Sequence, residues 1–269
     1  MRTALFIRER SAFMLNAAEK LSETIEKEGI ECSDIFSVHD PLPAADMILS
    51  MGGDGTLLSL LPIVRDSGIP ILGVNYGRLG FLSSSAPMEV GRAIASGKFS
   101  IEKRSLIHVP GVSDRIYPYA LNELAIHRIG AAMLGIEVSV DGAPLPTYWA
   151  DGILVATSSG STAYSLSVGG PIVFPGSRVL IISPIAPHNL NVRPIVLPDT
   201  SRISLKLHSR DSMVSLSLDN RQLAVPGSIS VDVSLAGFTF NIVRISGGGF
   251  IKALTGKLFW GYDLRNNNA

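Results

Sequence analysis

The stretch Gly52-Gly53-Asp54-Gly55-Thr56 decides how this chain of 269 residues is interpreted. It stands between two apolar runs, residues 47–51 and 57–61, which predict a buried strand before the glycines and a helix after them. Glycine lets the backbone adopt conformations closed to other residues and lets a ligand come close to the main chain. Free amides at a helix start favour a phosphate, so we expect the glycines and Thr56 to bind one.

Asp54 is the unexpected residue in this stretch. A carboxylate repels phosphate, so we expect Asp54 to meet a hydroxyl group or a metal ion instead. The alternative is a plain turn in which the aspartate bonds its own backbone. The buried strand before the five-residue string favours a ligand site over a plain turn.

The composition is that of a globular protein without bulk attraction for polyanions. Hydrophobic residues make up 46% of the chain, enough for a sizeable core. The 23 basic and 23 acidic side chains cancel, so charge does not favour a nucleic acid or a membrane surface. Cys32 is the only cysteine, which excludes an internal disulfide and suits a reducing compartment. The apolar run at residues 4–7 is too short for a signal peptide, and none approaches the roughly 20 residues that cross a bilayer, so we expect a cytoplasmic protein.

Up to residue 97, strand patterns alternate with helical patterns. The expected elements are strands at residues 3–7, 35–38, 47–51 and 69–74 and helices at 11–27, after the glycine stretch, and at 87–96. This alternation predicts a Rossmann-like parallel sheet with helices on its faces, an N-terminal α/β domain over residues 1–97. Ligands bind such sheets at the carboxyl ends of the strands, where the glycine stretch and the loop at residues 75–81 fall. Pro62 should kink or end the helix after the glycines.

From residue 98 onwards, short strand patterns replace the helical spacing. They cover residues 101–109, 120–127, 135–140, 152–156, 179–183, 203–208, 214–218, 229–233 and 238–245. Asp141-Gly142 is a strong hairpin signal and Asp219-Asn220 a weaker one. We expect a C-terminal antiparallel β-sandwich domain over residues 98–246. Residues 247–269 begin with glycines, contain a short helical pattern at 250–255, and are expected to pack on the N-terminal domain.

Three stretches of the later part are too polar for plain strands. Asn122-Glu123 interrupts an apolar segment, and Asp151-Gly152 opens a strand that leads into residues 157–171, which are rich in serine, threonine and glycine. Their small hydroxyl groups offer many hydrogen bonds, and Tyr164 adds a ring face for stacking on a base. The alternative is a serine-rich surface loop.

Taken together, these stretches resemble the NAD kinase family. The resemblance rests, in the family's order, on Gly-Gly-Asp-Gly-Thr, on Asn-Tyr-Gly-Arg-Leu-Gly-Phe at 75–81, on Asn122-Glu123, and on Asp151-Gly152 through Pro171. It covers most of residues 46–171 and, weakly, the tail near 258–261. The first motif also occurs in near versions in lipid kinases and phosphofructokinases. The string Gly-Ser-Thr-Ala-Tyr-Ser-Leu-Ser at 160–167 is specific.

The resemblance implies an enzyme that phosphorylates the 2′-hydroxyl of the adenosine ribose of NAD to give NADP, with ATP, another nucleoside triphosphate or polyphosphate as phosphate donor. Asp54 would be the proton acceptor at that hydroxyl. The NAD-binding positions implied are Asp54, Gly55, Phe81, Asn122, Glu123, Asp151, Ser159, Thr162, Ala163, Tyr164, Ser165, Leu166, Ser167, Ala186 and Gln222. A homo-oligomer, dimer or tetramer, is also implied, with each site completed by a neighbouring subunit.

The chemistry of the residues agrees with this assignment. A ribose hydroxyl is a poor nucleophile, and a nearby carboxylate can accept its proton as the oxygen attacks the γ-phosphorus. Mg²⁺ or another divalent metal should neutralise the phosphate charge, held mainly by the phosphates. The chain has no Gly-x-x-x-x-Gly-Lys-Ser/Thr string, so residues 52–56 would bind the phosphate donor in place of a P-loop.

Two departures and two alternatives accompany the resemblance. Ser158 stands where family members often have proline, and Trp149 where they often have a basic residue, which bears on contacts to the nicotinamide side. A lipid or sugar kinase sharing the glycine motif would need an apolar acceptor pocket or a basic sugar-phosphate clamp, and the sequence indicates neither. A dinucleotide-binding sensor without catalysis is the other alternative, and the intact Asp54 argues against it.

The remaining polar side chains favour structural roles. The histidines, His39, His108, His127, His188 and His208, have no metal-ligand spacing. The chain lacks a Gly-x-Ser-x-Gly elbow, so its serines are poor hydrolase nucleophiles. Arg193 is read as a solvated loop residue rather than a phosphate ligand.

Overall fold

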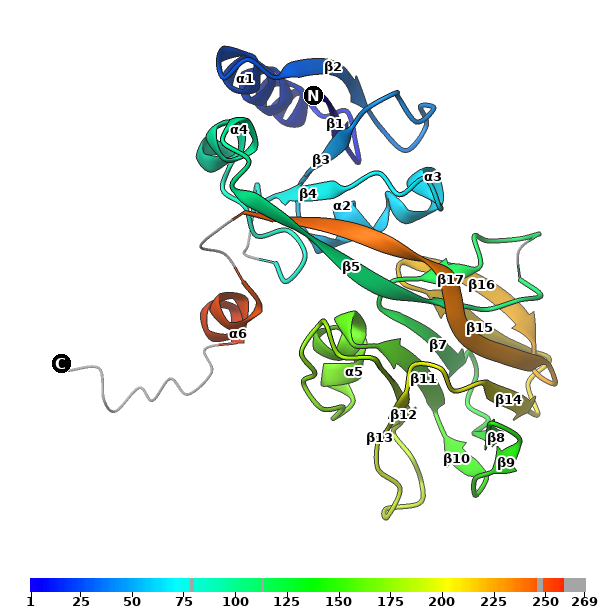
Figure 1. Ribbon diagram of the computed structural model, residues 1–269. Coiled ribbons are helices and arrows are strands. Elements are labelled where there is room, and N and C mark those ends of the chain that lie inside the picture. Colours follow the sequence, from blue (N-terminus) through cyan, green and yellow to red (C-terminus); the bar gives the residue numbers. More distant parts are fainter. Residues whose placement is uncertain (78–79, 113, 246–248, 259–269) are drawn as a thin grey trace, which may run out of the picture. The chain divides into compact units, whose positions relative to one another are not determined.

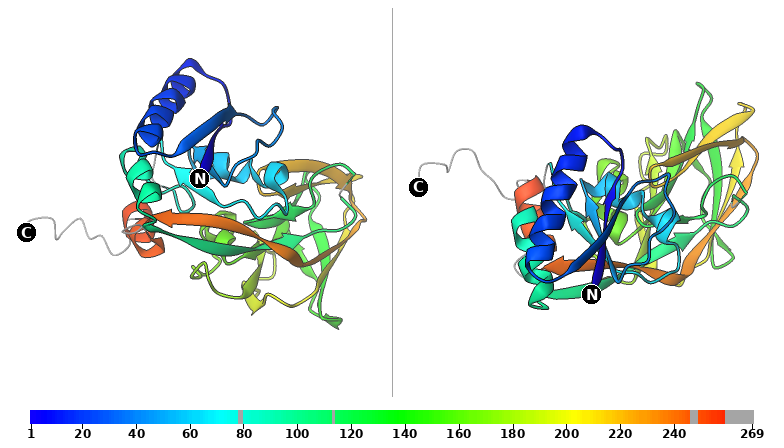
Figure 2. Two further views of the ribbon diagram at one scale, coloured as in Figure 1. Left: turned by 45° about the horizontal axis from the view of Figure 1, so that its top comes forward. Right: turned by 90° about the horizontal axis from the view of Figure 1, so that it is seen from above.

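The computed structural model describes residues 1–77, 80–112, 114–245 and 249–258. It divides into two compact units, one formed by Met1–Lys103 with the chain from Asn241 on, and the other by Arg104–Phe240. Two strands, β5 (Phe99–His108) and β17 (Ser230–Ile245), pass from one unit into the other, and β17 is the long orange strand in Figures 1 and 2. A mixed α/β unit and a β-rich unit confirm the expected fold class.

The first unit is built on a parallel sheet. Its other elements are β1 (Arg2–Ile7), α1 (Ala12–Lys27), β2 (Glu31–Phe36), β3 (Met47–Met51), α2 (Asp54–Leu58), α3 (Leu61–Val64), β4 (Ile71–Val74), α4 (Pro87–Ala95) and α6 (Phe250–Leu258). The strand order is β2-β1-β3-β4-β17, and every neighbouring pair is parallel. The chain leaves β1 toward β2 and leaves β3 toward β4. The carboxyl ends of β1 and β3 therefore form a topological switch point, where open α/β sheets bind ligands.

Burial explains why these strands were predictable. All residues of β3 and β4, and all but the first of β1, are buried, as expected of parallel strands covered on both faces. Leu5, Leu49 and Leu72 share one hydrophobic core with side chains of α1 and α4. Figure 1 shows these two helices close together. The edge strand β2 begins earlier than the expected residues 35–38, because its outward side chains are polar and give no hydrophobic signal.

The helices follow their capping signals. Ser11 caps α1 by accepting a hydrogen bond from the Met14 amide at 3.2 Å, and Gly29, with φ +79°, follows its end. The helix after the glycines stops at Leu58, and Pro62 falls in the first turn of the separate helix α3, where no amide partner is needed. The helix α6 belongs to the first unit, where Phe250 packs against Phe81 with ring centroids 5.8 Å apart. The C-terminal helix thus returns to the N-terminal part of the chain, as expected.

The second unit is an antiparallel sandwich. Its elements are β6 (Tyr119–Ala120), β7 (Glu123–Arg128), β8 (Leu134–Val140), β9 (Ala143–Pro144), β10 (Tyr148–Ala150), β11 (Gly152–Thr157), the 3₁₀ helix η1 (Ser159–Thr162), α5 (Tyr164–Ser167), β12 (Val179–Ile185), β13 (Ile195–Pro198), β14 (Ile203–His208), β15 (Met213–Leu218) and β16 (Arg221–Pro226). One sheet has the order β13-β12-β11-β7-β15-β16, and β10-β8-β14-β17 run beside one another in the other. Side chains of both sheets, such as Ile126 and Leu205, share one apolar core.

Several predicted strands have different limits in the structure. Asp141 and Gly142 have φ of +52° and +83°, which confirms the tight hairpin between β8 and β9. The segment expected at 120–127 is split into β6 and β7, and the two segments expected at 229–233 and 238–245 form the single strand β17. The serine-rich stretch is not a plain loop, because it forms η1 and α5. Among the described residues, no helix is both long and apolar enough to cross a bilayer.

Candidate active site

The glycine turn lies between β3 and α2, at the switch point of the parallel sheet. Gly52 has φ +149°, and a Cβ there would collide with the Thr56 side chain, so this position requires glycine. Gly53 precedes α2 in extended conformation, and Asp54 is the first helical residue. The turn thus places Asp54 at the carboxyl end of β3, where the sequence predicted a ligand site.

The Asp54 carboxylate binds three consecutive backbone amides. Oδ2 accepts from Phe81 N at 2.9 Å, and Oδ1 accepts from Leu82 N at 3.0 Å and Ser83 N at 2.9 Å. Gly80, just before this segment, leaves room for the carboxylate, because a Cβ there would collide with Oδ1. Asp54 therefore bonds a segment distant in sequence rather than its own turn. Its side chain remains 25% exposed, so part of the carboxylate is open to a ligand.

The same segment is held from its other side by Arg244 of β17. The guanidinium donates to Phe81 O at 2.9 Å and to Leu82 O at 3.0 Å, and it pairs with Glu102 at 3.1 Å. The Arg244 side chain is only 11% exposed. Residues 81–83 thus have their amides bonded to Asp54 and two carbonyls bonded to Arg244, which fixes the segment beside the glycine turn.

Helix α6 covers this segment. Lys257 places its ammonium 3.6 Å from Asp54 Oδ2 and 4.8 Å from the centre of the Phe81 ring. The Phe250 ring contacts Phe81 from the same helix. Asp54, Phe81 and Lys257 therefore form one cluster within the first unit.

A second carboxylate with three amides organises the polar part of the second unit. Asp219 has φ +53° at the β15–β16 hairpin, and its buried side chain accepts from the amides of Leu121 and Asn122 at 2.9 and 2.7 Å and from Glu123 N at 3.3 Å. Arg221 pairs with it at 3.4 Å. Asp219 thus holds the backbone of Asn122 and Glu123 where the chain passes from β6 to β7.

Glu123 is the most perturbed acid of this cluster. Burial, together with the negative charge of Asp219, raises its pKa from 4.5 to about 8, although the Tyr164 amide opposes the shift by hydrogen bonding. Burial also raises the pKa of Asp219, against the opposing effect of Arg221 and the three amides. Glu123 Oε2 has no hydrogen-bond partner among the described residues. At neutral pH the Glu123 side chain is therefore mainly a neutral acid that can both donate and accept a hydrogen bond.

The serine-rich segment packs against the start of β7. The Gly160 amide donates to Thr157 Oγ1 at 3.2 Å, and a Cβ on Gly160 would collide with the Asn122 backbone. Tyr164 stacks on His127 with ring centroids 5.4 Å apart and planes inclined by 19°. Burial lowers the pKa of His127 and raises that of Tyr164. The His127–Tyr164 pair presents an aromatic surface beside Glu123.

The predicted residues of this segment differ in accessibility. Ser159 and Ser165 are buried, and Ser165 Oγ has no hydrogen-bond partner among the described residues. Ser159 Oγ lies 3.4 Å from the Arg104 guanidinium. The side chains at least partly open to solvent are Thr162, Ala163, Tyr164, Leu166 and Ser167.

Asp151, Ala186 and Gln222 make contacts of their own. Asp151 makes a two-pronged ion pair with Arg128, at 2.6 and 3.2 Å, and its amide donates to the carbonyl just before Ala186, which has φ +45°. Asp151 and Ala186 are thus neighbours at one end of the β11–β12 pair. Gln222 lies on β16, where its amide group donates to Ser215 Oγ at 2.7 Å. In the part of the chain that the structure describes, no hydrogen bond joins Gln222 to Glu123 or Tyr164.

The structure thus arranges the predicted residues as two clusters, one in each unit. Gly52, Gly53, Asp54, Gly55, Thr56 and Phe81 belong to the first, and Asn122, Glu123 and the segment 159–167 to the second. Of the predicted loop at 75–81, residues 78–79 lie outside the described residues, as do residues 247–248 of the glycine run and residues 259–261 of the tail motif. Sequence reasoning missed Asp219, Arg221, Arg244 and Lys257. The weak hairpin signal at Asp219-Asn220 was the one available indication.

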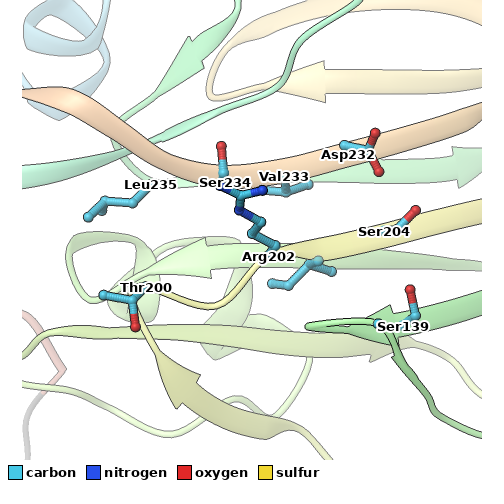
Figure 3. A pocket seen from close by; sticks show the side chains of 10 residues that line it. Ser139, Thr200, Arg202, Ser204, Asp232, Val233, Ser234 and Leu235 are labelled. Atoms are coloured by element: carbon cyan, nitrogen blue, oxygen red, sulfur yellow. The ribbon is translucent and has the colours of Figure 1, made fainter.

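A hollow elsewhere in the second unit does not involve these residues. It has a volume of about 700 Å³ and lies over β8, β14 and β17, where Ser139, Arg202, Ser204 and Asp232 contribute polar groups. Figure 3 shows the Arg202 side chain extending toward Ser234 of β17. None of the predicted site residues lines this hollow. Among the described residues, no three histidine, cysteine, aspartate or glutamate side chains converge to hold a metal ion.

We expect Glu123→Gln to remove a pH dependence of stability. Because the folded-state pKa of about 8 lies above the ordinary 4.5, the folded protein holds an extra proton between these values. Binding of this proton by Glu123 therefore stabilises the folded protein. The contribution is complete below pH 4.5 and is lost as the pH rises through 8. Between pH 5 and 9, the free energy of unfolding of the wild type should fall relative to that of the variant. The pKa shift of Glu123 corresponds to a fall of roughly a few kcal/mol. Chemical denaturation at both pH values measures it, with exposed Glu89→Gln as control, and identical profiles of wild type and Glu123→Gln would contradict the assignment.

We expect Arg244→Met to destabilise the first unit by about 2–4 kcal/mol, because it leaves two carbonyls without their charged donor and Glu102 without this ion pair. Urea denaturation measures the loss. Arg92→Met, at an exposed position of α4, is the matched control and should change stability by less than about 0.5 kcal/mol. Equal stabilities of the two variants would show that Arg244 does not hold the segment.

Comparison with known proteins assigns the family. The ATP-NAD kinase N-terminal domain model matches residues 7–96, and the ATP-NAD kinase C-terminal domain model matches residues 121–245. An NAD kinase of Flavobacterium psychrophilum is 38% identical over 97% of this chain and 89% of its own length. An NAD kinase of Porphyromonas gingivalis is 42% identical over 86% of this chain and 82% of its own length.

Solved structures agree with these matches. An NAD kinase from Archaeoglobus fulgidus, solved in complex with ATP, superposes with a TM-score of 0.78 at 26% identity and covers 97% of this chain and 98% of its own. Yeast NADH kinase complexed with NADH has the same fold, with a TM-score of 0.84 at 21% identity, covering 100% of this chain and 90% of its own. The chain belongs to the NAD kinase family, whose reaction is the phosphorylation of NAD to NADP.

Proposed function

We propose that this chain transfers the terminal phosphoryl group of ATP to the 2′-hydroxyl of the adenosine ribose of NAD, with Asp54 as the proton acceptor. The observation that carries the proposal is the position of the Asp54 carboxylate, partly exposed beside a glycine turn at the switch point of the sheet. A Cβ on Gly53 would meet no atom within 4 Å, so the space next to the turn can admit phosphate oxygens. The ATP complex of the Archaeoglobus fulgidus relative supports ATP as the phosphate donor.

The step balances with the groups named. The ribose 2′-oxygen forms a bond to the γ-phosphorus, the bond from that phosphorus to the β,γ-bridging oxygen breaks, and ADP leaves with the bonding electrons. The hydroxyl proton passes to the Asp54 carboxylate. The three amides leave about one of the roughly four lone-pair sites of this carboxylate open, enough for one proton.

Binding of NAD is assigned to the second cluster together with Asp54, Gly55 and Phe81. Neutral Glu123 and Asn122 are suited to ribose hydroxyl groups, because they combine donors and acceptors. The partly open segment 162–167, with Tyr164 stacked on His127, offers an aromatic face to a base. Ser159 and Ser165 of the same segment are buried, and they are assigned to the NAD site with it. Asp151, Ala186 and Gln222 are assigned to the same dinucleotide, and in the free protein Asp151 pairs with Arg128 while Gln222 bonds Ser215.

A divalent metal, Mg²⁺ by preference, accompanies ATP in this proposal. Asp54 has its oxygens largely taken by amides, so the phosphate oxygens would provide most of the ligands, with the glycine turn supporting the phosphates. When bound, the metal would neutralise negative charge on the transferring phosphoryl group.

A homo-oligomer, dimer or tetramer, in the cytoplasm completes the proposal. Trp149, Phe174 and Leu190 of the second unit are 45%, 60% and 85% exposed, so large apolar side chains are available on its surface for a subunit contact. The single cysteine, Cys32, suits a reducing compartment. Light scattering coupled to gel filtration should give a mass of two or four chains, whereas a monomer at assay concentrations would contradict the oligomer.

We expect Asp54→Asn to lower kcat for NADP formation from NAD, ATP and Mg²⁺ by at least about 100-fold, while NAD still binds. The substitution also places an amide NH₂ group against backbone amides, so it disturbs residues 81–83. Arg244→Lys is the matched control, because it weakens the same segment and keeps the carboxylate. Coupled detection of NADP measures turnover, and calorimetry measures NAD binding. If the two variants lose activity equally, Asp54 acts through the segment and not as proton acceptor.

A further inference from the structure

One face of α6 lies on the segment that binds Asp54. Phe250, Ala253 and Lys257 are spaced three and four residues apart, which places them on the same side of the helix. Ala253 is 3% exposed, Phe250 contacts the Phe81 ring, and the Lys257 ammonium lies over that ring at 4.8 Å. The packing of Phe250 and Ala253 therefore places this face of α6 beside Asp54, and the cation–π contact brings the Lys257 ammonium near the carboxylate.

The contact between Lys257 and Asp54 is of a different kind from the amide contacts. At 3.6 Å, the distance from Nζ to Oδ2 exceeds that of a hydrogen bond, so charge attraction alone joins the two groups. The Lys257 and Asp54 side chains are 40% and 25% exposed, which makes this the solvent-facing side of the carboxylate. A partly exposed ion pair of this length is weak, and the ammonium can leave it at little cost.

The other cations described near the turn are placed differently. The Arg244 guanidinium donates hydrogen bonds to Phe81 O and Leu82 O and pairs with Glu102. The Arg8 guanidinium lies about 4.0 Å from where a Cβ on Gly55 would stand, at the end of β1 and not at the carboxylate. Among the described residues, Lys257 is the cation that pairs with Asp54.

We propose that Lys257 is a ligand of the transferring phosphoryl group. This inference rests on the proposed function, because the phosphoryl group must then come next to Asp54. An ammonium 3.6 Å from the proton acceptor is within reach of that group's oxygens, and its flexible stem lets it turn toward them. In the free protein Lys257 offsets the carboxylate charge that would repel ATP. When ATP binds, the ammonium moves to the phosphoryl oxygens and leaves Oδ2 open for the 2′-hydroxyl proton.

Steady-state kinetics of Lys257→Met test the ligand role, because methionine keeps the apolar stem and removes the charge. We expect KM for ATP to rise and kcat to fall, each on the order of tenfold, with KM for NAD within about twofold of wild type. Lys257→Arg keeps the charge and should recover most of the loss. Lys252→Met, at an exposed position of the same helix, is the matched control and should behave as wild type. Wild-type KM for ATP and kcat in Lys257→Met would overturn the proposal.

A binding measurement separates a phosphate ligand from a residue that only shields Asp54. Calorimetry with a non-hydrolysable ATP analogue and Mg²⁺ compares Asp54→Asn with Asp54→Asn/Lys257→Met. If Lys257 binds the phosphates, the double variant should bind the analogue about tenfold more weakly. If Lys257 only shields the carboxylate, the two variants bind equally and the proposal fails. Absence of NADP formation by the wild-type protein would instead refute the proposed function, and the calorimetric comparison would still decide on Lys257.

Discussion

The attachment of residues 81–83 to the Asp54 carboxylate is the interaction on which the first half of the site depends. Three consecutive amides converge on two oxygens, and Arg244 holds the carbonyls of the same segment. A carboxylate bonded in this way has a fixed orientation, because any rotation would break at least one charge-assisted hydrogen bond. The glycine turn fixes its origin, since Asp54 follows Gly52 and Gly53 at the end of a fully buried strand. Position and orientation are both set before any ligand arrives.

The second unit also contains a carboxylate that accepts hydrogen bonds from three consecutive backbone amides, but there its role is different. Asp219 binds the amides of residues 121–123 as Asp54 binds those of residues 81–83. The Asp219 side chain is fully buried and paired with Arg221, whereas Asp54 remains partly exposed. Asp219 is therefore structural, and burial, assisted by the negative charge of Asp219, raises the pKa of the neighbouring Glu123 to about 8. Asp54 keeps one side open, which is what a proton acceptor requires.

Sequence reasoning found the parts of the molecule whose signals are local. The strands β1, β3 and β4 are continuous apolar runs, and α1 has a serine cap and a glycine after its end. Each of these elements could therefore be predicted from the sequence alone. The edge strand β2 and the short strands β9, β10 and β13 were mislocated or missed because edges and short ladders carry little apolar pattern. For the serine-rich stretch, a surface loop was the alternative to a ligand site. Its helical turns, η1 and α5, depend on packing against β7, which the sequence pattern does not show.

At the candidate site, too, only the residues with local signals could be predicted from the sequence. Asp54, Asn122 and Glu123 were found because their motifs are contiguous. Arg244 acts on carbonyls more than 160 residues away, and Lys257 meets Asp54 only because α6 returns to the first unit. In the sequence both are ordinary basic residues, one in a strand and one at a helix end. Long-range pairs of this kind leave no trace in spacing or composition.

In the proposed reaction, one carboxylate both holds residues 81–83 and accepts the ribose proton. A crystal structure of the full chain with NAD, Mg²⁺ and a non-hydrolysable ATP analogue would show whether Asp54 performs both roles. We predict that an Asp54 oxygen lies within hydrogen-bond reach of the 2′-hydroxyl, about 2.6–3.2 Å, while the three amides stay bonded to the carboxylate. A 2′-hydroxyl out of reach of Asp54, or a carboxylate that has released all three amides to reach it, would show that Asp54 does not combine the two roles.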